Sequence, residues 1–255
     1  MLLAIDIGNT SIAIGVFEGE KLRTTWRMAT SIQHMADEYA TFLLNIMRHQ
    51  ELYPASIKGI TMCSVVPPLT TTFIDLSQRY FNITPLVVGA GIKTGVSIRM
   101  DNPREVGADR IADAAAAHHL YSGPVIVIDL GTATTFGIVS KEGDYIGGII
   151  ATGIATAAEA LTTRTAQLPR VELVRPKKVI GTNTVTAMQS GIVYGYVSLV
   201  EGMVARIQNE LGEKATVIAT GGYADLISKE TTIIDEVNPN LTLIGLRLIY
   251  QMNKD

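Results

Sequence analysis

Two short turns in this sequence carry residues suited to handling phosphate. They are Asp6 to Thr10, which reads Asp-Ile-Gly-Asn-Thr, and Asp129 to Ala133, which reads Asp-Leu-Gly-Thr-Ala. A carboxylate repels a phosphate group, but it can hold Mg²⁺ or the water shell of Mg²⁺ beside the phosphate. The glycine lets the backbone approach the phosphate closely, and the amide and hydroxyl groups that follow can donate hydrogen bonds. A single turn of this kind indicates little, because Asp and Gly are common turn formers.

The two turns recur in the same context, and this strengthens the interpretation. Asp129 follows Asp6 by 123 positions (129 − 6), and the same offset brings Gly8 onto Gly131 and Asn9 onto Thr132. An aliphatic segment precedes each turn and a second one follows it. This order predicts a duplicated lobe. Two such turns facing each other would hold one polyphosphate from both sides.

The rest of the chain predicts an α/β fold of two closely packed lobes, residues 1–115 and 116–255. Apolar strands are expected before and after each turn, and helical spacing appears at five places between them. A further apolar strand, Ala215 to Ala219, ends in Thr220-Gly221-Gly222, which suits a backbone close to a flat nucleoside or is only a tight turn. The helices are expected at 37–47, 70–80, 111–121, 184–211 and 241–250.

The segment from Asp101 to Arg110 has a different chemistry. Asn102 can cap a short helix that Gly107 breaks, and Asp109 then stands at the start of an alanine-rich helix. The macrodipole keeps a carboxylate there ionised, so it can accept the proton of a substrate hydroxyl. Arg110 can bind a carboxylate through two parallel hydrogen bonds. The alternative is that Asp109 only caps the helix and pairs with Arg110.

Composition narrows the classes of function. The chain has 255 residues, 47% of them hydrophobic, and a formal net charge of −3. It shows no basic footprint of a nucleic-acid binder, no metal-binding His/Cys spacing, and no apolar run long enough to cross a membrane. Cys63 is the one cysteine and is expected to be a small buried apolar residue. We expect a soluble cytoplasmic protein with a small-molecule partner.

Six segments, in order, resemble type III pantothenate kinase of the actin, Hsp70 and sugar-kinase superfamily. They are the two phosphate turns, Ser64 to Pro67, Asp101 to Arg110, Gly181 to Thr184, and Gly221-Gly222. The resemblance covers essentially the whole chain. It implies two ribonuclease-H-like lobes with ATP between them, and phosphorylation of pantothenate to 4′-phosphopantothenate, the entry step of coenzyme A synthesis.

The resemblance also implies roles for individual residues. Asp109 is the general base, and Asp129 is a ligand of a monovalent cation, K⁺ or NH₄⁺. Asp6 lies on the Mg²⁺ side of the phosphates, a metal that the charge of a triphosphate requires. A homodimer is implied as well. The expected ATP contacts are Asp6, Ile7, Gly8, Asn9, Thr10, Ser11, Ile12, Ala13, Thr132, Gly221 and Gly222, and the expected pantothenate contacts are Met100, Gly107, Ala108, Asp109, Arg110 and Thr184.

Two positions depart from the family pattern. Met100 stands where many relatives have a tyrosine, and weaker pantothenate binding is expected from the lost phenolic hydrogen bond. Thr152 replaces a proline and is expected to loosen a loop at 147–153. These departures are the only support for an alternative, an ATP-binding accessory or regulatory protein that has lost turnover. A third hypothesis, another small-molecule kinase, requires a different segment at 101–110.

Overall fold

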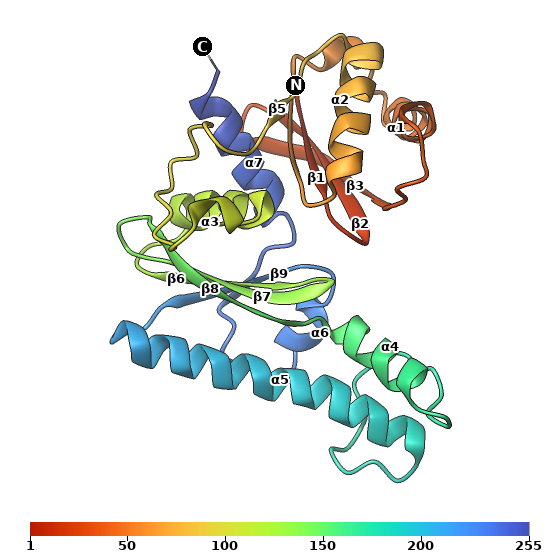
Figure 1. Cartoon of the computed structure of the whole chain (residues 1–255), viewed down its shortest axis with the longest axis vertical. Coiled ribbons are helices and arrows are strands. Elements are labelled where there is room, and N and C mark those ends of the chain that lie inside the picture. The colour runs from red at the N-terminus through yellow and green to blue at the C-terminus, as the bar shows by residue number, and fades with distance from the viewer. Residues whose placement is uncertain (255) are drawn as a thin grey trace. The chain divides into compact units, whose positions relative to one another are not determined.

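The computed structural model describes residues 1–254, and these divide into two units (Figure 1). The first unit comprises residues 1–97, 101–116 and 241–254, and the second comprises residues 98–100 and 117–240. Each unit is built on its own five-stranded sheet. No helix in the described part of the chain is long and apolar enough to cross a membrane.

The sheet of the first unit combines an antiparallel meander with two parallel strands. Its strands are β1 (Leu2–Ile7), β2 (Ser11–Glu18), β3 (Lys21–Ala29), β4 (Gly59–Ser64) and β5 (Leu86–Val87), in the order β3-β2-β1-β4-β5. β1 pairs antiparallel with β2 and parallel with β4. The carboxyl end of β1 therefore lies beside the carboxyl end of β4, and the first phosphate turn connects β1 to β2.

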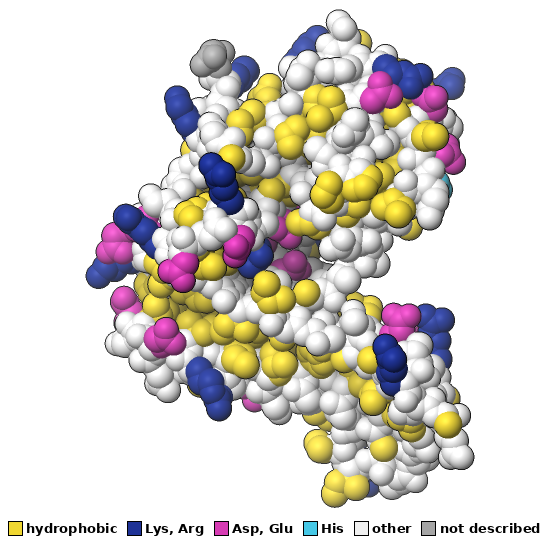
Figure 2. Space-filling view, in the orientation of Figure 1, with side chains coloured by type: hydrophobic (Ala, Val, Ile, Leu, Met, Phe, Trp, Pro, Cys, Tyr) yellow, Lys and Arg dark blue, Asp and Glu magenta, His cyan; other side chains and the backbone are white. Residues whose placement is uncertain are grey.

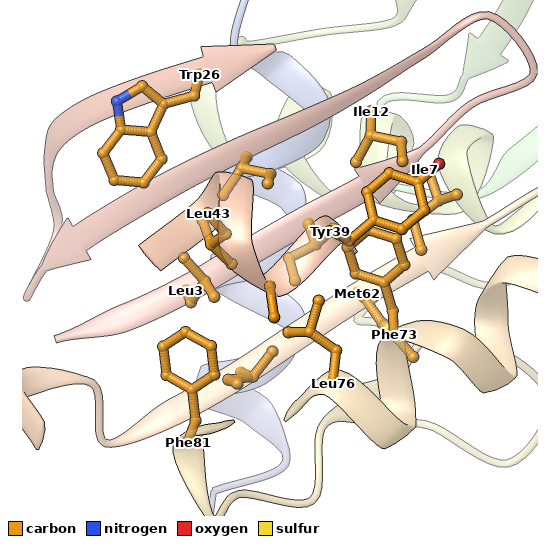
Figure 3. Close-up of a cluster of buried hydrophobic side chains, with 14 of the residues drawn as sticks. Leu3, Ile7, Ile12, Trp26, Tyr39, Leu43, Met62, Phe73, Leu76 and Phe81 are labelled. Atoms are coloured by element: carbon orange, nitrogen blue, oxygen red, sulfur yellow. The ribbon is translucent and has the colours of Figure 1, made fainter. Parts of the chain in front are cut away.

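One face of this sheet is covered by α1 (Ala36–His49) and α2 (Pro67–Phe81). Alternate residues of the strands, such as Leu3 and Ile7 of β1 and Ile12 of β2, point into the core under these helices (Figure 3). Tyr39 from α1 and Phe73 from α2 meet there with ring centroids 4.9 Å apart. Because side chains alternate between faces, Asp6 belongs to the opposite face.

That opposite face carries α7 (Leu241–Met252), which packs on β1, β2 and β4. The helix α3 (Ala108–Leu120) lies against α7, and a Cβ added at Gly245 would stand 1.9 Å from the backbone oxygen of Ala112. The Thr242 hydroxyl also donates to the buried Asp113 carboxylate at 2.7 Å. The second lobe was expected to extend through residue 255, but these contacts place residues 241–254 in the first unit.

The second unit repeats the topology of the first. Its strands are β6 (Val125–Leu130), β7 (Ala133–Val139), β8 (Tyr145–Thr152), β9 (Thr216–Thr220) and β10 (Glu236–Val237). Their order, β8-β7-β6-β9-β10, matches β3-β2-β1-β4-β5 strand for strand. The structure thus confirms the duplication. The second hairpin is one residue shorter, because Asp6 pairs with Ala13, seven positions on, whereas Asp129 pairs with Thr135, six positions on.

The helices of the second unit are α4 (Ile154–Arg164), α5 (Thr184–Leu211) and α6 (Ala224–Ser228), and 3₁₀ turns occur in the first unit at Pro54–Ser56 and Pro103–Glu105. The helix α5 lies along one face of the sheet (Figure 1) and buries residues such as Val200 and Val204 against it. The Asn183 side chain accepts from the Thr186 amide at its start, and Gly212 ends it with φ of 72°.

The loop expected at 147–153 is largely a strand. Residues through Thr152 belong to β8, and Thr152 pairs with Ala133 of β7. The Thr152 carbonyl also accepts a hydrogen bond from the Tyr196 hydroxyl at 2.6 Å. Thr152 therefore lies in an edge strand, and the expected loop at 147–153 was wrong, because strand pairing holds this segment through Thr152.

Candidate active site

The first phosphate turn is a tight hairpin, and the residue that directly follows β3 makes hydrogen bonds to its backbone. The Gly8 amide donates to the Ser11 carbonyl at 3.1 Å, and a Cβ at Gly8 would stand 3.0 Å from that oxygen. The Thr30 hydroxyl donates to the Gly8 carbonyl at 2.7 Å, and the Thr30 amide donates to the Thr10 carbonyl at 3.0 Å. The turn is thus fixed in shape, while Asn9 and Thr10 remain exposed.

Asp6 lies half-buried at the end of β1, directly before this turn. The thiol of Cys63, its partner on β4, donates to Asp6 Oδ1 at 3.3 Å. Burial is the main cause that raises the pKa of Asp6 from 3.8 to about 6, and the charge of Asp109 raises this pKa further. The hydrogen bond from Cys63 and the charge of Arg27 lower the pKa of Asp6 and so oppose the rise. The same burial raises the pKa of the Cys63 thiol well above its usual value.

The segment before α3 folds as its sequence predicts. The Asn102 side chain accepts from the Arg104 amide at 3.3 Å and donates to Glu105 at 2.7 Å, and this closes the 3₁₀ turn Pro103–Glu105. Asp109 then lies in the first turn of α3, where its Oδ1 accepts from the Arg110 amide at 2.8 Å. A Cβ at Gly107 would stand 2.3 Å from that same oxygen.

Gly107 is therefore required for the position of Asp109, because its missing side chain leaves the space that the carboxylate occupies. Arg110 lies beside the same glycine, with its Nε 3.6 Å from the position of a Gly107 Cβ. The charge of Asp109 reaches both Asp6 and Cys63. The first unit thus brings together the predicted base and the predicted metal-side carboxylate from segments about a hundred residues apart.

The second phosphate turn is surrounded by backbone from two other segments of the second unit. A Cβ at Gly221, whose φ is +91°, would stand 2.3 Å from Asp129 Oδ1. A Cβ at Gly153 would stand 2.1 Å from the Thr132 carbonyl, which also accepts from the Thr156 hydroxyl at 3.1 Å. Asp129, Thr132 and Gly221 thus lie close together at one end of this sheet.

The remaining predicted residues fall into four groups. Ile7 and Ile12 are fully buried in the core, so that any contact they make with ATP involves only their backbone. Ala13 is buried on the Asp6 face, beside Ser11, which is half-buried. Met100 and Thr184 belong to the second unit, whereas Gly107 to Arg110 belong to the first. Gly222 follows Gly221, and a Cβ there would meet nothing within 4 Å.

A pocket of about 1480 Å³ opens in the second unit beside Thr184. Its walls come from β8, α4, α5 and the Gly181–Thr184 segment, and they include Ile150, Leu161, Arg164 and Tyr196. Thr184 is thus placed at a concave, mostly apolar surface. This is the kind of surface that small molecules and partner chains occupy.

Three residues at these turns were not expected from the sequence as parts of the site. Thr30 clamps the first turn, Cys63 contacts Asp6, and Gly153 packs on the second turn. Cys63 is fully buried, as expected, but it is also a hydrogen-bond donor to Asp6. Each contact depends on strand pairing, and no short motif indicates it.

The donor set suits Mg²⁺ held largely by its substrate. No three His, Cys, Asp or Glu side chains among residues 1–254 come together as a metal cage. Mg²⁺ is commonly bound by one or two carboxylates together with phosphate oxygens and water. The half-buried Asp6 carboxylate, with Asp109 near it, fits that mode.

The chain resembles known proteins in sequence and in structure. Residues 2–206 match the sequence model of the type III pantothenate kinase family. The chain is 60% identical over 253 residues to a type III pantothenate kinase of Dehalococcoides mccartyi, with 99% of this chain and 98% of that protein covered. It is 52% identical over 253 residues to one of Moorella thermoacetica, with 99% and 100% covered. Its fold is similar to that of the inorganic polyphosphate/ATP-glucomannokinase of an Arthrobacter species, at 17% identity and a TM-score of 0.51, with 99% and 98% covered.

Two sheets of one topology, each with an Asp-x-Gly turn after its first strand, define a two-lobed α/β fold similar to that of a solved sugar kinase. This confirms the fold class expected from the motifs. Within that class the sequence matches are specific and run over nearly the whole chain. The chain belongs to the type III pantothenate kinase family.

Proposed function

We propose that this chain transfers the γ-phosphoryl group of ATP to the primary hydroxyl of pantothenate, giving 4′-phosphopantothenate and ADP at the start of coenzyme A synthesis. Family membership at 60% identity supports this reaction. The observation that carries the mechanism is the position of Asp109, whose charge is close enough to raise the pKa of Asp6. A base beside a metal-side carboxylate is what transfer to an alcohol requires.

Asp109 takes the proton of the pantothenate hydroxyl while that oxygen forms its bond to the γ-phosphorus. The bond from the γ-phosphorus to the bridging oxygen of ADP breaks in the same step. Gly107 and Ala108 shape the turn that presents Asp109, and Arg110 binds the pantothenate carboxylate. Met100 and Thr184 are proposed as further pantothenate contacts. Met100 offers an apolar surface without a phenolic hydrogen bond.

The residues of the two turns bind ATP and its cations in this proposal. Gly8, Asn9, Thr10 and Ser11 present backbone and side-chain donors to phosphate, and Asp6 holds Mg²⁺. Mg²⁺, when bound, neutralises charge on the phosphate oxygens. In the second unit Thr132 binds phosphate, Gly221 and Gly222 line the nucleoside, and Asp129 binds K⁺ or NH₄⁺. The closeness of Gly221 to the Asp129 carboxylate supports a shared site for these groups.

The second subunit of a homodimer is also part of the proposal. Hydrophobic side chains gather over the sheet and helices of the second unit (Figure 2). Ile180 is 82% exposed, and Ile150 and Val179 are 64% and 66% exposed. Monomeric proteins rarely expose large contiguous apolar patches. A second copy of this chain is the occupant that the family resemblance implies. We place the protein in the reducing cytoplasm, which suits Cys63 as a free thiol.

ADP release tests this function directly. With wild-type protein, Mg·ATP and K⁺, release should depend on pantothenate and should fall when K⁺ is replaced by a larger organic cation. Release that ignores pantothenate would contradict the proposed acceptor. Release that needs pantothenate but ignores K⁺ and NH₄⁺ would contradict only the role of Asp129. The accessory-protein alternative, which no comparison supports, predicts ATP binding without turnover.

A further inference from the structure

Four side chains form a row across the first sheet, on the face opposite the α1 and α2 core. The strand register pairs Cys63 with Asp6, Asp6 with Ala13, and Ala13 with Arg27. Trp26 and its second neighbour Met28 pack toward the core, so that Arg27 between them points to the Asp6 face. Nothing in the motif analysis singled out Arg27.

The geometry of this row lets Arg27 reach the phosphate turn. Neighbouring strands lie roughly 4.8 Å apart, so that the Cα of Arg27 is about 10 Å from that of Asp6. The residue between them, Ala13, is small, so that its side chain adds little bulk between Arg27 and Asp6. The Arg27 charge acts on Asp6, since it is one of the causes that lower the pKa of that carboxyl.

The charges on this face call for such a cation. Asp6 and Asp109 are both acidic, and the charge of Asp109 is one of the causes that raise the pKa of Asp6. A triphosphate brought to the Asp6 turn adds further negative charge, which a guanidinium can offset with two directed hydrogen bonds. Arg27 is exposed, so that a ligand can contact it.

The segment that continues from β3 also holds the turn in place. Thr30 lies three residues beyond Arg27 and fixes the carbonyls of Gly8 and Thr10. The end of β3 is therefore held in a constant position relative to the turn, and Arg27 is held with it. A cation on a rigid strand can act on developing charge without reorganising.

We propose that Arg27 binds the phosphate chain of ATP beside Asp6 and offsets negative charge there during phosphoryl transfer. The proposal rests on the proposed function, because it assumes that the Asp6 turn handles the phosphates of ATP. It adds a phosphate-binding residue from β3, which lies outside all six motifs.

The chain offers a matched control on the same strand. Arg23 lies four residues before Arg27 on β3, at the β-bulge where the pairing with β2 shifts register, and is exposed. It pairs with Glu18, at the far end of the β2–β3 hairpin from the phosphate turn. Removing its charge changes the net charge of the protein as much as removing that of Arg27.

Calorimetric titration with Mg·AMP-PNP, a non-hydrolysable analogue of ATP, measures the binding step on its own. For Arg27→Gln we expect an affinity about tenfold weaker or more, as for loss of a charge-assisted hydrogen bond, and for Arg27→Lys a smaller loss. For Arg23→Gln we expect no more than about a twofold change, as for an exposed pair away from the ligand. Steady-state kinetics should show a lower kcat/KM for ATP in Arg27→Gln alone, at an unchanged melting temperature.

Equal losses in Arg27→Gln and Arg23→Gln would overturn the proposal, because they would reflect net charge alone. Wild-type affinity and kcat/KM in Arg27→Gln would overturn it as well, and so would a loss that tracks a lowered melting temperature. Failure of the proposed function looks different. In that case wild-type protein would show no pantothenate-dependent ADP release, whatever the behaviour of Arg27→Gln.

Discussion

At the scale of single residues, the Asp6 carboxylate is held in a state that costs stability. Burial and the nearby Asp109 raise its pKa to about 6, in spite of the opposing Cys63 thiol and Arg27 charge. When folding raises the pKa of a carboxyl, that carboxyl contributes its full stabilisation at pH values below its unfolded pKa, which is 3.8 for Asp6. That stabilisation is lost as the pH rises through about 6. Raised pKa values of this kind are common among carboxylates of functional sites.

Replacing Asp6 by asparagine should therefore stabilise the protein without ligand at pH 8. We expect a gain of about 1–2 kcal/mol in the free energy of unfolding, since Asp6 is only half-buried and solvent weakens the effect. The gain should shrink as the pH falls below the unfolded pKa of 3.8, toward about pH 3, where the carboxyl is mostly protonated in both states. Urea denaturation at the two pH values measures it, with Glu210→Gln on the exposed side of α5 as a control. A less stable Asp6→Asn at pH 8 would refute the sign.

Some of the residue-scale site could be predicted from the sequence, and some could not. Asp6, Asp109 and Asp129 stand in short motifs whose spacing indicates their chemistry. The contacts of Thr30 and Cys63 come from strand pairing between segments 22 and 57 residues from their partners. Cross-strand register is set by the whole sheet, and a local pattern does not contain it.

At the scale of elements, the position of α3 depends on the last helix of the chain. Gly245 lets α7 approach the backbone of Ala112, and Thr242 binds the buried Asp113 one turn after Asp109. The alanine-rich pattern predicted α3, and the apolar pattern predicted α7. Their crossing was not predicted, because the close approach of α7 to the backbone of α3 depends on a single glycine.

Breaking this crossing should destabilise the first unit and disturb the base. Gly245→Ala introduces a Cβ 1.9 Å from the Ala112 oxygen, and the helices must move apart at a cost of about 2–3 kcal/mol. Thr242→Val removes the donor to Asp113, and we expect a loss of about 1–3 kcal/mol. Thermal unfolding measures both changes. Gly202→Ala on α5, where a Cβ meets only the end of the Arg206 side chain, is the control. A Gly245→Ala protein as stable as the control would contradict the crossing.

At the scale of the whole molecule, duplication is the organising feature. The 123-residue offset indicated two lobes, and the strand orders of the two sheets agree. The sequence could not assign residues 241–254 to the first unit, because the apolar pattern of a helix does not indicate which sheet the helix packs against. Nor could it show that the second hairpin is one residue shorter.

The exposed apolar surface of the second unit yields a test of assembly. Ile180→Arg places a charge at an 82% exposed position of that surface and should shift the proposed dimer toward monomer, because the charge would be buried at the interface. Light scattering after size-exclusion chromatography measures the mass. Ile32→Arg, at a 61% exposed position of the first unit, is the matched control and should leave the mass unchanged. A dimer that survives Ile180→Arg unchanged would exclude this residue from the interface.

The central claim is that Asp109 is the base for phosphoryl transfer to pantothenate. Mass spectrometry of the products from wild-type protein and Asp109→Asn, with saturating Mg·ATP and pantothenate, tests it most directly. We expect phosphopantothenate from wild type and a rate lower by about 10²–10⁴ in the variant, with AMP-PNP binding retained. No phosphopantothenate from wild type, or a variant as fast as wild type, would contradict the claim.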